Sequence, residues 1–195
     1  MLACVTCAVA VVGCDTHAGT EGPLVSAPAT RYLLTIDQLA TPDFTVTDPA
    51  HSEDIAALAA ADSTSQQQLR DEGFRGAASV RYSRPVEVGT SNGPIDVIAT
   101  VELFDSSDGA HHAFARTAQR YDSESGAAPV STGSLGDEAH ADSLLRTAPS
   151  GIELVQITVV WRVANAVNVL IVRGRYGGAL LDDALLLAHR ITELR

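Results

Sequence analysis

The sequence predicts an α+β domain whose antiparallel sheet is covered on one face by helices. Three observations support this fold class. Several β-rich segments follow one another directly, which favours antiparallel pairing because parallel strands need long crossover connections. The helical segments are segregated from the strands instead of alternating strictly with them. The last segment, residues 179–194, has apolar residues at helical spacing and is expected to lie across the sheet.

The chain is long enough for a single ordinary domain behind a short leader. Of its 195 residues, 46% are hydrophobic, which allows a core to form without metals or disulfides. The 13 basic and 24 acidic residues give a net charge of -11, which repels nucleic-acid phosphates and anionic lipid headgroups. We therefore expect no nucleic-acid partner.

The N-terminal segment has the features of a lipoprotein leader. Residues 2–12 are uncharged and too short to span a bilayer, which takes about 20 apolar residues, but their length suits the core of a signal peptide. The following "VVGC" resembles the bacterial lipobox, and this resemblance implies a diacylglycerol thioether on the Cys14 thiol. The first basic residue is Arg31, so we expect the leader to be truncated at its start. The alternative is a buried N-terminal strand or a frayed apolar tail with an incidental cysteine.

Three parts follow from this interpretation. Residues 1–13 are expected to be a signal peptide, residues 14–30 a flexible tether rich in small and polar residues, and residues 31–195 the α+β domain. The lipid bilayer would be the partner of Cys14. The C-x-x-C of Cys4 and Cys7 lacks a second ligand pair, so we expect no metal there and no cofactor.

In the first half of the domain, "FTVT" has the composition of a strand. A helix is expected to begin with Ser52 as its N-cap, and a second helix over residues 63–73 is expected to stop at Gly73. Strands are expected over residues 77–84 and 95–104. In the latter, alternation places Ile95, Val97, Ala99, Val101 and Leu103 on one face, and Asp96, Ile98, Thr100, Glu102 and Phe104 on the other.

The second half begins with an expected helix over residues 106–124, followed by a loop over residues 126–136. Residues 152–163 and 167–175 are β-rich, and their joint apolarity indicates central strands. The connection between them is short enough for a hairpin in which Asn165 takes a left-handed conformation.

One serine motif matches a catalytic pattern. "GTSNG", residues 89–93, matches the G-x-S-x-G pattern in which Ser91 would be a nucleophile. That nucleophile elbow needs a strand before the serine and a helix after it, whereas here a strand follows. A turn serine between two antiparallel strands is the favoured interpretation.

A group of possible metal ligands occurs in "GDEAHAD", where Asp137, Glu138, His140 and Asp142 offer carboxylate and imidazole donors. Their spacing matches neither an EF-hand loop nor a zinc motif, so a solvated acidic turn is favoured.

Three arginines stand in or beside the two apolar strands: Arg162, Arg173 and Arg175. If they cluster at a sheet edge, they would bind a carboxylate or phosphate in bidentate fashion. The alternatives are pairing with some of the many acidic residues and exposure at the ends of the strands.

Segments in the C-terminal part of the sequence resemble those of known proteins. "SLGDEA", "VVWRVANAVNVLIVRG" and "ALLLAHR" resemble segments of uncharacterised secreted lipoproteins of actinobacteria and related high-GC bacteria. In outline the domain also resembles the extracytoplasmic sensor domains of actinobacterial serine/threonine kinases. The resemblance is good over residues 130–195 and loose over residues 35–125, and it implies a ligand-binding or accessory role with no catalytic residues.

The leading hypothesis is therefore a membrane-anchored extracytoplasmic lipoprotein without catalytic activity. It would bind a small hydrophobic or anionic ligand, or another protein of the cell envelope. Two alternatives stay open. One is an envelope hydrolase that uses Ser91 or a metal within Asp137–Asp142, and the other is a structural scaffold of the envelope.

Overall fold

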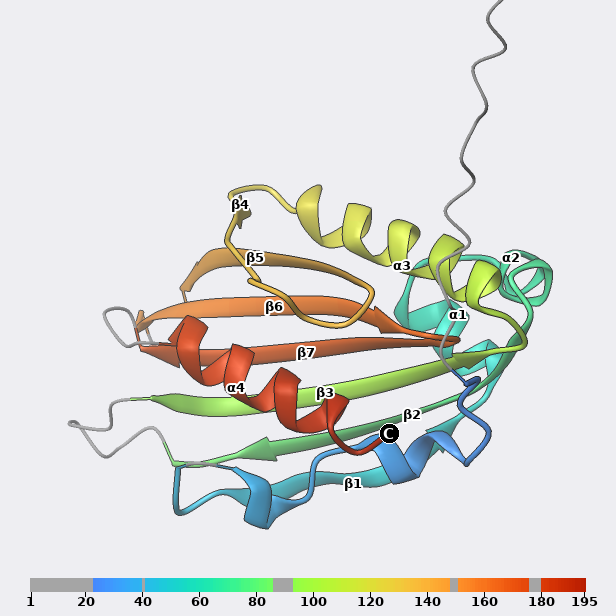
Figure 1. The fold of residues 1–195 in the computed structure, drawn as a ribbon. Coiled ribbons are helices and arrows are strands. Elements are labelled where there is room, and N and C mark those ends of the chain that lie inside the picture. Colours follow the sequence, from blue (N-terminus) through green and yellow to red (C-terminus); the bar gives the residue numbers. More distant parts are fainter. Residues whose placement is uncertain (1–22, 40, 86–92, 148–150, 176–179) are drawn as a thin grey trace, which may run out of the picture.

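In the part of the chain that the structure describes, seven strands form one antiparallel sheet (Figure 1). The computed structural model describes residues 23–39, 41–85, 93–147, 151–175 and 180–195. The sheet order is β1-β2-β3-β7-β6-β5-β4, and every neighbouring pair is antiparallel. The predicted α+β class with an antiparallel sheet is thereby confirmed. The strands are β1 (Thr45–Glu53), β2 (Phe74–Ser83), β3 (Pro94–Phe104), β4 (Ala128–Pro129), β5 (Glu138–Thr147), β6 (Glu153–Val163) and β7 (Ala166–Arg175).

Side-chain caps determine where the main helices begin. Asp54 accepts hydrogen bonds from the first-turn amides of the helix that begins at residue 55, and Ser65 and Ser106 do the same for the helices that begin at residues 66 and 107. The prediction of Ser52 as the first N-cap is wrong because β1 continues to Glu53. The helices are α1 (Ile55–Ala61), α2 (Gln66–Asp71), α3 (Ser107–Asp122) and α4 (Leu180–Thr192), with 3-10 turns η1 (Ala29–Tyr32) and η2 (Ile36–Gln38). No helix in the described ranges is long and apolar enough to cross a membrane.

Helices pack on both faces of the sheet, whereas the sequence predicted helices on one face. As predicted, the closing helix α4 lies across one face, where Ala184 and Leu187 join a core with Val159 and Leu170 (Figure 1). Helix α3 packs on the opposite face over a second apolar cluster. The reason is that the central strands are apolar on both sides, so each side must be shielded from water. The second cluster contains Phe104, Ala110, Ala113, Val160, Val167 and Val169.

The packed domain begins before residue 31, the expected end of the tether. Val25 and Ala29 are buried in the main core. Val25 is fixed by the buried Asn165 side chain, whose Oδ1 accepts from the Val25 amide at 2.6 Å and whose Nδ2 donates to the Val25 carbonyl at 3.2 Å. The same Nδ2 donates to the Phe104 carbonyl at 2.7 Å. The N-terminal segment is thus attached to the β6–β7 turn.

In that turn the left-handed residue is Ala164, with φ 52°, so the prediction of a left-handed Asn165 is wrong. The conformation of Ala164 leaves the Asn165 side chain directed into the protein, where it makes the three hydrogen bonds above.

Residues 138–147 form a strand, whereas the sequence predicted an acidic turn over residues 136–142. The expected acidic turn is the start of strand β5, which pairs with β6 from Glu138↔Arg162 to Thr147↔Glu153. The preceding loop also contributes β4, which pairs with β5 at Ser143 and Asp142. Tertiary pairing overrides the low strand propensity of these charged residues.

Asn165→Ala is expected to lower the free energy of unfolding by about 2–4 kcal/mol, because it leaves the buried Val25 amide and the Phe104 carbonyl without this partner. Chemical denaturation measures the loss. The control is Thr47→Ala, which removes an exposed 3.3 Å bond to the Arg81 carbonyl and should cost less than about 1 kcal/mol. Equal losses in the two variants would contradict the anchoring role of Asn165.

Candidate ligand-binding pocket

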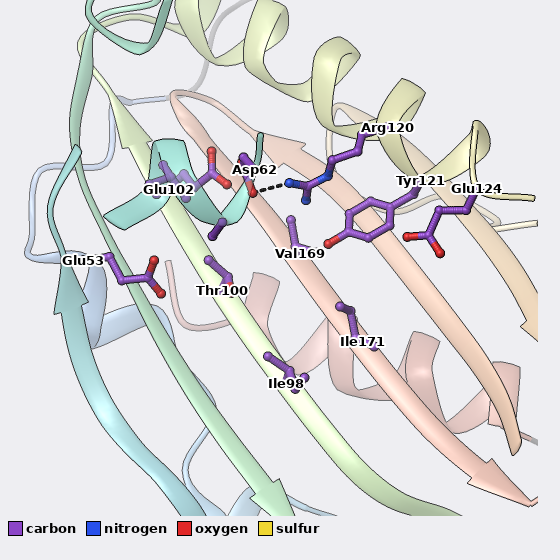
Figure 2. Close-up of a pocket in the computed structure, with 12 residues that line it drawn as sticks. Glu53, Asp62, Ile98, Thr100, Glu102, Arg120, Tyr121, Glu124, Val169 and Ile171 are labelled. Carbon is purple, nitrogen blue, oxygen red and sulfur yellow. Dashed lines mark hydrogen bonds and ion pairs between the residues drawn. The ribbon is translucent and has the colours of Figure 1, made fainter. Parts of the chain in front are cut away.

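A pocket of about 310 Å³ lies on the sheet face opposite α4 (Figure 2). Strands β3 and β7 form its floor, and residues of α1 and α3 form its walls. It is at the lower end of the size range of small-molecule sites. The lining residues are Glu53, Leu58, Ala61, Asp62, Ile98, Thr100, Glu102, Arg120, Tyr121, Glu124, Val169 and Ile171.

The floor of the pocket is apolar at one end and polar at the other. Residues two apart on a strand share a face, so Ile98, Thr100 and Glu102 of β3 all point to the pocket side. The pairing of β3 with β7 sets Ile98 opposite Ile171 and Thr100 opposite Val169. A ligand on this floor would therefore contact branched apolar side chains at one end and a carboxyl group at the other.

Glu102 is the buried polar group of the site. It is 1% exposed, and among the described residues no hydrogen-bond partner is found for its Oε2 atom. Burial raises the pKa of Glu102 to about 8, and the nearby Asp62 carboxylate adds to the increase, while Arg116 and Arg120 oppose it. The carboxyl group is consequently mostly protonated and uncharged at neutral pH.

An ion-pair cluster positions the walls of the pocket. Arg116 binds Glu72 through two bonds of 3.1 and 2.9 Å, and Arg120 binds Asp62. The two arginines are four residues apart on α3, and the two acids end α1 and α2 as their C-caps. The cluster therefore joins the α1–α2 pair to α3. Such partly buried ion pairs add little net stability but define the arrangement of the groups they join.

Helices α2 and α3 approach each other very closely beside this ion-pair cluster. A Cβ atom on Gly109 would lie 1.9 Å from the Glu72 carbonyl oxygen. Glycine is therefore required at this position for the helices to meet as they do.

The outer part of the pocket carries Tyr121 and Glu124. The Arg120 guanidinium lies 4.5 Å from the centre of the Tyr121 ring, and burial raises the pKa of the Tyr121 hydroxyl. Glu124 forms an ion pair with Arg146. Since the charge of Arg120 is matched by Asp62, the lining as a whole is acidic.

The three arginines predicted to bind a ligand do not meet. Arg162 lies opposite Val167 near the β6–β7 turn and pairs with Glu138 and Asp137. Arg173 lies opposite Gln156, far along the hairpin, and binds Asp96 at 2.8 Å. Arg175 lies still further along β7, opposite Leu154. Arg162 and Arg173 thus make the structural pairs given as one alternative, and ligand binding by the three arginines stays a prediction.

The other candidate residues are dispersed as well. Asp137 accepts from the Ala164 amide at 2.7 Å, and Glu138 binds both Arg162 and His111. Burial opposes ionisation of Glu138, but the hydrogen bonds from His111 and Arg162 prevail and lower its pKa. His140 and Asp142 pair with each other. Ser91 and Cys14 lie outside the described residues.

No protein-family model matches the chain, and no curated protein matches it. Among solved structures, the fold is similar to that of the extracellular domain of PknH from Mycobacterium tuberculosis. The two share 11% sequence identity with a TM-score of 0.50, over 89% of this chain and 99% of that chain. At this identity the likeness is one of fold. It supports, at the level of the fold, the expected resemblance to actinobacterial extracytoplasmic sensor domains.

Glu102→Gln is expected to flatten the pH dependence of stability. The folded state raises the pKa of Glu102 from 4.5 to about 8, so the stability due to the protonated form is present below pH 4.5 and lost as the pH rises through 8. The difference between wild type and variant should change by a few kcal/mol between about pH 5 and 9. Denaturation at several pH values measures it.

The matched control is Glu53→Gln, which alters another carboxyl group of the same pocket and should keep the wild-type slope. Parallel curves for wild type and Glu102→Gln would contradict the assignment of a protonated, buried Glu102.

Proposed function

We propose that this chain is a non-catalytic, extracytoplasmic ligand-binding domain whose pocket holds a small molecule beside Glu102. The observation that carries the proposal is the Oε2 atom of Glu102, a 1% exposed side chain that lines the pocket, for which the described part of the chain offers no hydrogen-bond partner. A buried polar atom without a partner is costly, and a ligand that supplies the missing bond gains from it.

The lining favours one class of ligand. Ile98, Val169 and Ile171 offer apolar contact, while Glu53 and Glu102 offer carboxyl groups. A molecule with an apolar body and an amine or other hydrogen-bond donor matches both ends of the floor. Of the two ligand classes expected from the sequence, this supports the hydrophobic one. An anionic ligand would meet the Glu53 carboxylate, and the positive charge of Arg120 is already matched by Asp62.

The fold supports a location outside the cytoplasm, since the similar solved structure is an extracellular domain. The lipobox-like sequence ending at Cys14 supports attachment to the membrane through a diacylglycerol group, because two acyl chains suffice for stable anchoring. Val25, which is buried in the main core, lies eleven positions after Cys14 in the sequence. A lipid group on Cys14 would therefore hold the domain near the bilayer surface.

Pocket occupancy is tested by native mass spectrometry of the protein purified from its own host. We expect an added mass that leaves on denaturation. Thr100→Trp, which fills the floor of the pocket, should abolish the added mass, whereas Thr147→Trp on the exposed end of β5 should retain it. An added mass that persists in Thr100→Trp, or equal native and denatured masses for the wild type, would overturn the proposal.

Anchoring is tested by Cys14→Ser in a chain produced in an actinobacterial host behind a complete signal peptide. The variant cannot form the thioether, so it should move from the membrane fraction to the soluble fraction. Cys7→Ser, which precedes the expected cleavage point, should remain with the membrane. Membrane association of Cys14→Ser equal to that of the wild type would refute lipidation at this residue.

A further inference from the structure

The end of α3 and strand β5 bring three metal-binding side chains together. Donor atoms of Asp122, His140 and Asp142 all lie within 4.8 Å of one another. His140 and Asp142 are two residues apart on β5 and therefore share a face of the sheet. Asp122 is the last residue of α3, and the chain returns from there through β4, which pairs with β5 at Asp142.

Asp142 provides an independent indication of a ligand. It is 3% exposed, and its Oδ2 atom lies 2.7 Å from His140 Nε2. Among the residues that the structure describes, its Oδ1 atom is buried and has no hydrogen-bond partner. A buried carboxylate oxygen in this state is unfavourable, and a bound cation would satisfy it.

We propose that Asp122, His140 and Asp142 form a binding site for a divalent transition-metal ion. One imidazole nitrogen with two carboxylate oxygens suits zinc, whereas calcium and magnesium prefer ligands that are all oxygen. Zinc would lie about 2.0–2.2 Å from each donor, between side chains that are already adjacent. Three protein ligands leave a fourth tetrahedral position for water or another molecule.

This site is separate from the ligand pocket but adjoins it along the chain. Tyr121 and Glu124, on either side of Asp122 in the sequence, line the pocket, whereas the three metal ligands do not. A bound ion would fix the end of α3 against β5. The proposal does not rest on the proposed function, because an empty pocket would leave the three ligands in place.

The site also differs from the metal site considered from the sequence. Of the residues Asp137–Asp142, only His140 and Asp142 take part, because Asp137 binds the Ala164 amide and Arg162, and Glu138 binds Arg162 and His111. The third ligand, Asp122, comes from the preceding helix.

The test is zinc binding by the full chain without a polyhistidine tag, measured by isothermal titration with ZnCl2 and by metal analysis after dialysis. We expect one zinc ion per chain at this site, and much weaker binding of calcium and magnesium. His140→Gln and Asp122→Asn should each weaken zinc binding at least about 10-fold, since each removes one of three ligands. His51→Gln, an exposed histidine on β1, should leave binding unchanged.

Asp122 is exposed at the end of its helix, so Asp122→Asn is expected to fold normally, and thermal unfolding verifies this. Asp142→Asn is a third variant with the same expected loss. Zinc binding that is undetectable in the wild type, or unchanged in folded Asp122→Asn and His140→Gln, would overturn the proposal.

Discussion

The central pairing of β3 with β7 is the constraint on which the rest of this structure depends. Because these strands lie in the middle of the sheet, both of their faces must be used. Val97, Ala99 and Val101 of β3 face the core beneath α4. The intervening Ile98, Thr100 and Glu102 form the floor of the pocket on the opposite face. A single alternating strand thereby supplies both the main core and the candidate site, and a one-residue shift in register would destroy both.

A cluster of charged side chains surrounds Glu102 of strand β3. Glu102, Asp62 and Glu72 bring three acidic groups near two guanidinium groups, those of Arg116 and Arg120. Burial is the main reason why Glu102 retains its proton, and the carboxylates of Asp62 and Glu72 add to this effect against the opposing charges of Arg116 and Arg120. The retained proton leaves Glu102 able to donate or accept a hydrogen bond, which is a useful property in a binding pocket.

The features that the sequence predicted correctly are those that depend on local periodicity. Alternation along residues 95–104 assigned the two faces of β3, and helical spacing identified α4. Strand β5 was missed because Asp137, Glu138 and Asp142 give the segment the composition of a turn. The pocket was missed because it requires α1 and α3 to meet over β3. The pair Arg116 and Arg120, four residues apart on one helix, was the sequence feature that could have indicated buried acidic partners.

The contact between Val25 and Asn165 joins residues 140 positions apart in the chain. The N-terminal segment cannot dock until the β6–β7 hairpin exists, so it must remain undocked while most of the domain is synthesised. Contacts of such long range slow folding, because the loop must close before they form. The segment nearest to the proposed membrane anchor would then be among the last parts of the domain to acquire its final structure.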